Sequence, residues 1–363
     1  MDFSIKCPSS LCNQPIFFIG ALIIYIAGQP WYFDRVTHDL VRAGLVTSAA
    51  DAPVLLRQYS AEGCTVWEFR ACGIPLANWQ EKQAEIQSAL NISAVKIIEG
   101  DDHQTILLYS VSPIAANTIV PWADSIVKKS DSFITLGRGL QGVDVTIDLC
   151  KTPHILIGGS TGSGKSVLLK IILLQTIKHG DAVFLADFKG GVDFPAEWHI
   201  NCTIITEESE LLKVLNAIST ELQRRKELFV QSGVAGIEEY RQKVGPLQRI
   251  IFACDEAAEL LDRTGTNKER KELLDQIESK ISLIARQGRA FGINLILATQ
   301  RPDANIVPGQ IKNNMDVRIC GKADATLSGI ILGSGDADKL IPKDSQGRFL
   351  MNDGTIFQGF DMR

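Results

Sequence analysis

The chain has 363 residues, of which 45% are hydrophobic and 22% charged, and its formal net charge is -5. This is the composition of a globular protein of about two domains, and it excludes a collagen-like or disordered chain. Because the net charge is negative, the molecule as a whole does not attract nucleic acid, so such contacts require a local basic surface. The eight scattered cysteines form no C-x-x-C pair, which argues against a zinc site and suits a reducing compartment.

A hydrophobic run lies near the N-terminus. Residues 16–28 are almost entirely apolar and are followed by an aromatic cluster at residues 31–33. The run is shorter than the ~20 residues of a membrane span unless the aromatic cluster extends it. Residues 1–33 are therefore either a membrane segment or a buried helix, and a cleaved signal peptide fits them less well. If the run spans, the arginines after it favour a cytoplasmic body.

Residues 34–112 are expected to form a small α+β domain. A helical rhythm ends near Gly44, and we expect a second short helix after Pro53, over residues 54–56. Further on, the expected elements are strands at 65–70, 95–98 and 105–109 and a helix at 79–90. Residues 113–132 follow as a linker.

Residues 133–363 read as a second, larger α/β domain. A hairpin at 133–148 leads into a series in which apolar strands alternate with amphipathic helices, which indicates a mostly parallel sheet covered on both faces. The active edge should then lie at the carboxyl ends of the strands. Past residue 180 the expected strands are 182–187, 249–254, 293–299, 317–320, 348–351 and 355–359, and the expected helices are 210–230 and 268–286.

One motif dominates this domain. The apolar strand that ends at Gly158 runs into the pattern G-x-x-x-x-G-K-S, and an apolar helix start follows. In this setting successive backbone N–H groups and a helix N-terminus converge on a polyphosphate, the lysine reaches the β and γ phosphates, and the serine hydroxyl can ligate Mg²⁺. ATP and Mg²⁺ are thus the expected cofactors. The predicted phosphate-binding residues are Gly159, Ser160, Thr161, Gly162, Ser163, Gly164, Lys165 and Ser166.

Two acids follow the apolar strand at 249–254. An aspartate at the end of a buried strand, downstream of a phosphate loop, suits Mg²⁺, so Ser166 and Asp255 are the predicted metal ligands. Glu256 is placed to polarise an attacking water, which indicates hydrolysis. The alternative is that the two acids cap the next helix.

Two further candidates flank the strand at 293–299. The amide of Gln300 can hold the attacking water or contact the γ-phosphate, or else close a loop by a hydrogen bond. Arg289 can stabilise transition-state charge if a neighbouring subunit supplies it, or else lie at a solvated helix end. Together with Lys165, Asp255 and Glu256, these two complete the predicted catalytic set.

A DNA contact is predicted at Lys312. It lies in the amide-rich segment 309–314, which suits phosphate contacts that position without reading sequence. The other basic clusters, at 224–226 and 268–271, stand in helical stretches full of acids and are better explained as solvated faces.

In this order, residues 153–166, 288–295 and 298–302 resemble the motifs of the FtsK/SpoIIIE family of DNA translocases, and the likeness covers roughly residues 60–360. The resemblance implies a RecA-like motor that assembles as a ring, usually a hexamer, around DNA and uses ATP to move it. On that basis Arg289 matches the family's finger arginine, Lys312 matches a pore position facing DNA, and the domain before the linker matches the family's adaptor domain.

Residues 187–191 and 320–324 resemble one branch of the family, the conjugative coupling proteins of the TcpA and ConQ kind. This resemblance implies an ATPase at the cytoplasmic face of the bacterial cell membrane that moves DNA during conjugative transfer, with a relaxase and channel proteins as partners and single- or double-stranded DNA as substrate. The alternatives are a chromosome-segregation translocase, a type VII secretion ATPase whose chains carry several motors, a platform that recruits a relaxase without pumping, and a cytoplasmic location.

Overall fold

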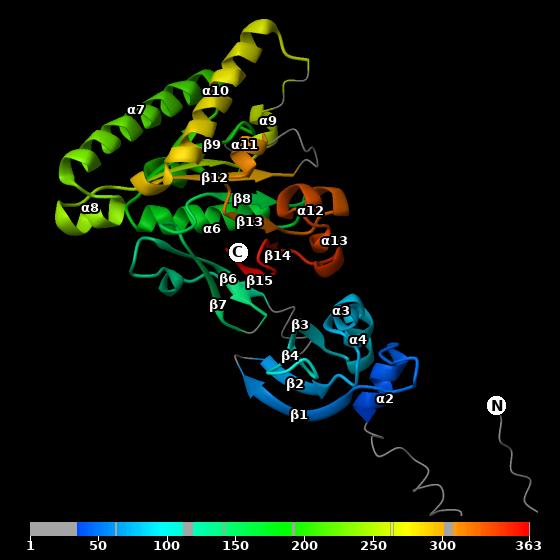
Figure 1. The fold of residues 1–363 in the computed structure, drawn as a ribbon. Helices are drawn as coiled ribbons and strands as arrows, with labels where there is room; N and C mark the ends of the chain where they lie inside the picture. The colour runs from blue at the N-terminus through cyan, green and yellow to red at the C-terminus, as the bar shows by residue number, and fades with distance from the viewer. Residues whose placement is uncertain are drawn as a thin grey trace, which may run out of the picture. The chain divides into compact units, whose positions relative to one another are not determined.

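The computed structural model describes residues 35–61, 64–111, 119–140, 142–190, 193–261, 263, 265–300 and 308–362. The hydrophobic run at 16–33 lies outside them, and within these ranges no helix is long and apolar enough to cross a membrane. The chain divides into two compact units, the first ending at Ala116 and the second beginning at Asn117, which are described separately (Figure 1).

Among the residues that the structure describes, the first unit is a four-stranded antiparallel sheet in the order β1-β2-β4-β3 with three helices. Alternation places Phe69 of β2 and Leu108 of β4 in its core, where the Phe69 ring lies 5.2 Å from that of Trp79. The strands expected at 65–70, 95–98 and 105–109 are confirmed. The elements are α2 (Arg35–Arg42), β1 (Val54–Ala61), β2 (Cys64–Arg70), α3 (Leu76–Glu81), α4 (Gln83–Leu90), β3 (Ser93–Glu99) and β4 (Thr105–Val111).

The short helix predicted over residues 54–56 is wrong, because these residues begin strand β1. β1 pairs with β2 along its whole length, from Val54 opposite Arg70 to Ala61 opposite Cys64. Three apolar residues are too few to distinguish a helical from an extended period, and pairing with a neighbouring strand decides the outcome. The helix predicted over 79–90 is in fact two, α3 and α4, which are separated at Lys82.

The second unit contains a mixed, mostly parallel sheet in the order β10-β9-β11-β12-β8-β13-β14-β15-β6-β7. The six strands from β10 to β13 are parallel, and the rest continue antiparallel. The strands are β5 (Val120–Pro121), β6 (Phe133–Gly139), β7 (Asp144–Asp148), β8 (Ile155–Gly158), β9 (Ala182–Ala186), β10 (Thr203–Ile205), β11 (Ile250–Cys254), β12 (Ile293–Thr299), β13 (Val317–Cys320), β14 (Arg348–Met351) and β15 (Ile356–Asp361).

Helices cover both faces of this sheet, as the pattern of apolar strands predicts (Figure 1). One core cluster joins the sheet to α7 and α10, and the other joins it to α6 and the β6–β7 hairpin. The helices are α6 (Lys165–Lys178), α7 (Glu208–Ser232), α8 (Ile237–Lys243), α9 (Ala257–Leu261), α10 (Lys268–Gln287), α11 (Gly309–Lys312), α12 (Ala325–Leu332) and α13 (Asp336–Leu340), with 3₁₀ turns η1 (Asp124–Ile126), η2 (Ala196–Ile200) and η3 (Arg289–Phe291).

Part of the segment expected to be a linker, residues 113–132, packs on the second unit. β5 pairs with β15, and the Trp122 ring lies edge-on to Phe360 at 5.9 Å. The Asp124 carboxylate accepts a hydrogen bond of 2.8 Å from Lys178 of α6. From residue 119 onward the chain is therefore attached to the sheet by apolar and ionic contacts.

A buried arginine ties α7 to the start of two central strands. The Arg225 side chain is 3% exposed, and its guanidinium donates to the Glu221 carboxylate and, at 2.7 Å each, to the carbonyls of Phe291 and Gln248. The two carbonyls precede β12 and β11. The adjacent Arg224 pairs with the same glutamate but is 56% exposed.

We expect Arg225→Met to lower the free energy of unfolding by about 2 kcal/mol, because the carbonyls of Phe291 and Gln248 lose their charged donor and Glu221 keeps only the solvated Arg224. Arg224→Met is the matched control, and it should change stability by less than about 0.5 kcal/mol since its ion pair is solvated. Urea denaturation of both variants checks this. Equal changes in the two variants would mean that the burial of Arg225 does not contribute to stability.

Candidate active site

The phosphate loop follows β8, the strand that lies between β12 and β13 near the middle of the sheet. Its last glycine, Gly164, has φ +97°, a backbone conformation that favours glycine, and a Cβ there would lie 3.0 Å from the backbone of Gly347. The position therefore requires a residue without a side chain. α6 begins at the next residue, so the loop stands at the N-terminus of a helix of 14 residues.

Distant segments hold the loop in shape. The Ser160 N–H donates to the Lys322 carbonyl at 2.7 Å, and the Gly347 N–H donates to the Ser163 carbonyl at 2.9 Å. A loop of fixed shape at the positive, N-terminal end of a helix is the arrangement that binds a polyphosphate. The predicted phosphate-binding residues thus form one continuous cradle.

The carboxylate of Asp255 lies beside this cradle at the end of β11 and is 1% exposed. The Ser166 hydroxyl donates to its Oδ1 at 3.3 Å, and the Lys165 Nζ lies 3.9 Å from the same atom. The sequence predicted that these three residues share a site, and the structure brings them together. Since a serine hydroxyl and a carboxylate are oxygen ligands of the kind that Mg²⁺ prefers, the pair fits the expected metal.

Glu256 is 4% exposed and is oriented from the neighbouring strand β12. Its Oε1 accepts a hydrogen bond of 2.8 Å from the Thr299 hydroxyl, and its Oε2 accepts one of 3.2 Å from the Gln300 N–H. The Gln300 side-chain oxygen in turn accepts from the Thr161 hydroxyl at 3.1 Å. Gln300 thus connects the phosphate loop to the glutamate, a link that its position after a strand does not by itself reveal.

Sequence reasoning missed a second lysine in the site, Lys189. Its ammonium donates to Asp255 Oδ2 at 3.0 Å, and its backbone N–H donates to the Asp187 carboxylate at 3.0 Å. Partial burial works against the charge of Lys189, but the Asp255 carboxylate, with Glu256 and Asp193 beyond it, raises its pKa overall. The sequence could have indicated Lys189, because it lies three residues after β9 and β9 pairs with β11.

A largely apolar pocket of about 410 Å³ borders the start of α6. Its lining includes Gly164 and Val167 at the loop and the start of α6, and Trp198, Phe360 and Met362 from other segments. Its size and its aromatic walls suit a nucleobase, and the loop next to it suits the attached phosphates. The sequence motifs did not indicate this pocket, whose lining comes from five separate segments.

Arg289 does not belong to this cluster. It lies exposed in η3, just before β12 begins, whereas the phosphate loop follows the end of the adjacent strand β8. Burial lowers the pKa of His154, the residue before β8, to about 4, and the positive charge of Arg289 contributes to this. Arg289 therefore lies at the opposite edge of the sheet from the phosphate loop of its own chain.

Lys312 ends the short helix α11, away from the phosphate loop in sequence and next to Arg318. Partial burial lowers the pKa of Lys312, and the nearby Arg318 guanidinium lowers it further. Two neighbouring cations repel each other, so an anion such as a phosphate group would be stabilised beside them.

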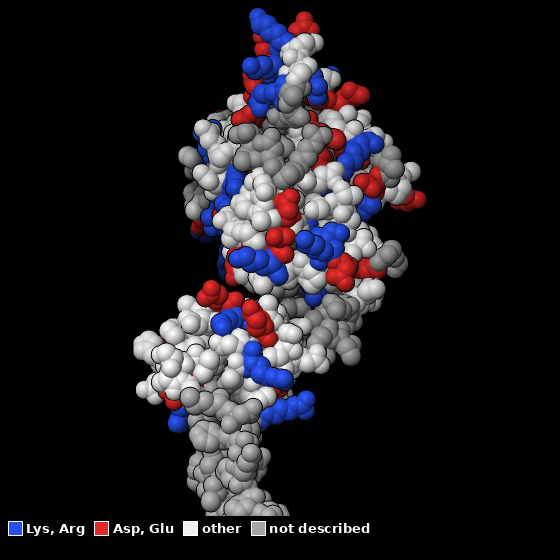
Figure 2. Space-filling view, turned by 90° about the vertical axis from the view of Figure 1, so that its right-hand side faces the viewer, with Lys and Arg blue, Asp and Glu red and all other residues white. Residues whose placement is uncertain are grey.

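The basic clusters at 224–226 and 268–271 are paired with acids, as their composition indicates. Arg224 bonds to Glu221, and Arg270 bonds to Glu208. On the face in Figure 2, lysines and arginines are interspersed with aspartates and glutamates rather than gathered into one basic area. Arg224 and Arg270 lie on solvated faces as expected, but the expectation is wrong for Arg225, which is buried on α7 against the start of two strands.

A phosphate loop at the end of a central parallel strand, with a buried aspartate and glutamate on the neighbouring strand, defines a P-loop ATPase. The FtsK/SpoIIIE family profile matches residues 125–304. The chain is 36% identical to the pCW3 conjugation coupling protein TcpA, solved as a monomer with ATPγS, with a TM-score of 0.68 over 90% of this chain and 94% of that one. The chain belongs to the FtsK/SpoIIIE family.

The chain is also similar to two more distant relatives. The DNA translocase FtsK of Staphylococcus epidermidis is 33% identical over 243 residues, which are 61% of this chain and 29% of the relative. The chain thus spans less than a third of the length of that translocase. The cytoplasmic domain of the type VII secretion ATPase EccC from Thermomonospora curvata is 25% identical, with a TM-score of 0.52 over 66% of this chain and 30% of that one.

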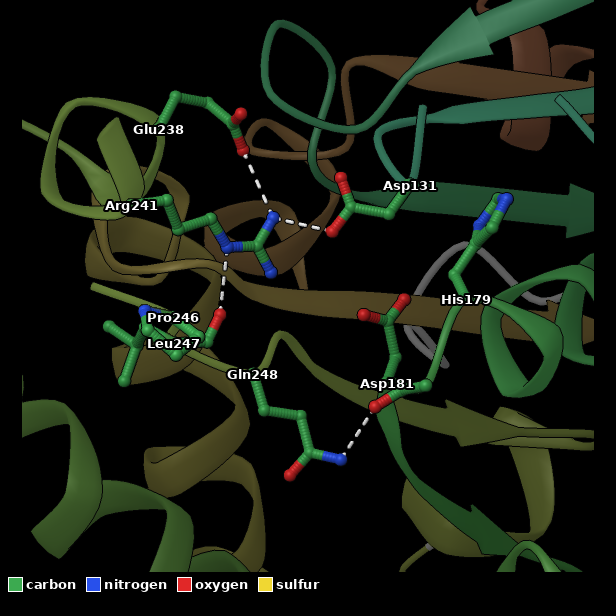
Figure 3. Close-up of a pocket in the computed structure, with 9 residues that line it drawn as sticks. Asp131, His179, Asp181, Glu238, Arg241, Pro246, Leu247 and Gln248 are labelled. Atoms are coloured by element: carbon green, nitrogen blue, oxygen red, sulfur yellow. Dashed lines mark hydrogen bonds and ion pairs between the residues drawn. The ribbon is translucent and has the colours of Figure 1, made fainter. Parts of the chain in front are cut away.

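A second depression, of about 650 Å³, lies where β9 and β11 begin (Figure 3). Arg241 lies between Glu238 and Asp131 and bonds to both. Asp181 has no such partner: its buried Oδ2 accepts no hydrogen bond from the residues that the structure describes. Burial raises the pKa of Asp181 to about 7, with Asp131 adding to the rise and Arg249 opposing it.

This pKa predicts a stability that falls as pH rises. Below about pH 4 the Asp181 carboxyl is protonated in both the folded and the unfolded protein. Between about pH 4 and 7 it ionises only in the unfolded protein, which lowers the free energy of unfolding as pH rises. Above about pH 7 it is ionised in both, and the loss of stability is complete. A rise from 3.8 to about 7 amounts to at most about 4 kcal/mol. Asp181→Asn should therefore match the wild type at pH 4 and exceed it in melting temperature at pH 8. A difference that does not change with pH would contradict this.

Proposed function

We propose that this chain is an ATP-driven, ring-forming DNA translocase that serves as a coupling ATPase in conjugative transfer. The observation that carries the proposal is the cluster of Lys165, Ser166, Asp255, Glu256 and Gln300 around one cradle, in a chain 36% identical to a conjugation coupling protein. The RecA-like motor, the adaptor role of the first unit, the relaxase and channel partners, and a place at the cytoplasmic face of the cell membrane belong to the same proposal.

The binding step rests on charge. The loop amides and the Lys165 ammonium hold the polyphosphate, and the pocket beside Trp198 takes the base. Ser166 and Asp255 would hold Mg²⁺, which supplies charge neutralisation at the β and γ phosphates. The low exposure of Lys165 and Asp255, 6% and 1%, strengthens each of these electrostatic contacts.

In the hydrolytic step Glu256 orients the attacking water and accepts its proton. The Thr299 hydroxyl and the Gln300 N–H fix the carboxylate, so little reorganisation is needed. Gln300 responds to the γ-phosphate through its contact with Thr161 of the loop.

Work on DNA requires a second copy of the chain. Arg289 lies at the opposite edge of the sheet from its own loop, so it is suited to complete the site of a neighbouring subunit in a ring. Lys312 with Arg318 supplies phosphate contacts that do not read sequence. The overall charge of -5 makes a local contact of this kind necessary.

Lys165→Ala is expected to abolish DNA-stimulated ATP turnover and to weaken ATPγS binding by about 10- to 100-fold, because a charge-assisted contact to phosphate is lost. Phosphate release with single- and double-stranded DNA, and ATPγS titration, measure the two effects. Lys178→Ala, in the last turn of α6 and outside the lining of the base pocket, is the control and should retain both. Undiminished turnover in Lys165→Ala would remove the phosphate-loop assignment.

Arg289→Ala should leave ATPγS binding intact and lower turnover by about 10³-fold. If the arginine acts across subunits, mixing this variant with Glu256→Gln should restore part of the activity, since mixed rings contain interfaces with both intact groups. Arg286→Ala, exposed on the last turn of α10, serves as the control. No restoration at any mixing ratio would argue against a role in trans.

A type VII secretion ATPase is the second candidate, favoured by the similarity to EccC. The two functions differ in what stimulates turnover: DNA for a translocase, a secreted protein for a secretion ATPase. Measuring ATP turnover with each, together with the mass of the assembly, separates them. A protein that stays monomeric with nucleotide and DNA and hydrolyses nothing would refute the translocase.

A further inference from the structure

The ion pair between Lys189 and Asp255 uses the same carboxylate that is expected to bind the metal. Asp255 is the carboxylate that would hold Mg²⁺, and an ammonium 3.0 Å from its Oδ2 already neutralises it. Its other oxygen accepts from Ser166, so both oxygens of Asp255 have a partner within the chain. A cation that binds this carboxylate must work against the charge of Lys189.

The side chain of Lys189 is able to leave the Asp255 carboxylate. Lys189 stands in the turn after β9, where the Asp187 carboxylate accepts its backbone N–H at 3.0 Å, while its side chain is 31% exposed. The next residue, Gly190, has φ +80°. The ammonium is on a flexible four-carbon stem, so it can change partners without moving the strand.

We propose that Lys189 competes with the divalent metal for Asp255 and so ties metal binding to nucleotide binding. Without nucleotide, the lysine satisfies the buried carboxylate and keeps the metal out. With nucleotide, the polyphosphate offers the ammonium another anionic partner beside Asp255, which frees the carboxylate. The inference rests on the proposed function for the identity of the nucleotide site, and it goes beyond it in assigning a role to Lys189.

The test uses Mn²⁺ alone, titrated into the full chain without nucleotide or DNA and followed by the electron paramagnetic resonance of the free ion. Lys189→Met should bind Mn²⁺ at least about tenfold more tightly than the wild type, because a like charge beside the carboxylate is gone. Lys189→Gln, which removes the charge but keeps a hydrogen-bond donor, should change in the same direction and covers the case in which the methionine variant does not fold.

Two controls locate the effect. Lys178 is 35% exposed and lies 2.8 Å from the Asp124 carboxylate, much like Lys189 on Asp255, but that carboxylate is 73% exposed and outside the site. Lys178→Met should therefore bind Mn²⁺ as the wild type does. Adding Asp255→Asn to Lys189→Met should remove the gain.

Equal Mn²⁺ affinity in the wild type and in folded Lys189→Met or Lys189→Gln would overturn the competition. A second measurement tests the coupling between nucleotide and metal binding. ADP should strengthen Mn²⁺ binding by a larger factor in the wild type than in Lys189→Met. An equal factor in the two proteins would overturn the coupling. Because the first titration contains neither nucleotide nor DNA, its outcome is independent of whether DNA stimulates turnover, so failure of this inference and failure of the proposed function remain distinguishable.

Discussion

The buried carboxylate of Asp255 is the constraint on which the site depends. A charge with 1% exposure is tolerated only when other groups compensate it. Here the compensation comes from Ser166 and Lys165 at the start of α6 and from Lys189 after β9. These groups meet only when β8, β9 and β11 have taken their places in the sheet, so the electrostatics of the site and the strand order specify each other.

The catalytic groups come from neighbouring parallel strands. β8 leads to the phosphate loop, β11 to Asp255 and Glu256, and β12 to Gln300. Because the carboxyl ends of parallel strands meet at one edge, residues more than a hundred positions apart become hydrogen-bonded partners, as Thr161 and Gln300 are. The same geometry sends η3, and with it Arg289, to the other edge. One sheet thus presents a complete nucleotide cradle on one side and an exposed arginine on the other.

Much of this could be predicted from the sequence, because buried parallel strands and the phosphate loop leave clear local patterns. The strand ends also predicted that Ser166, Asp255 and Glu256 would meet. Local sequence patterns gave no correct prediction where the pairing of strands determines the structure. Residues 54–56 form a strand because β2 lies beside them, and Lys189 enters the site because β9 adjoins β11. The apolar pocket at Trp198 was likewise invisible, since its lining is assembled from distant segments.

The bond between Gly347 and Ser163 makes the phosphate loop depend on a segment that comes some 180 residues later in the chain. β14 and β15, which follow that segment, pair with each other, and β15 also pairs with β6. During synthesis on the ribosome, β8 and α6 emerge long before these last strands. A nascent polypeptide that has not yet reached Gly347 therefore lacks one of the bonds that hold its phosphate loop in shape.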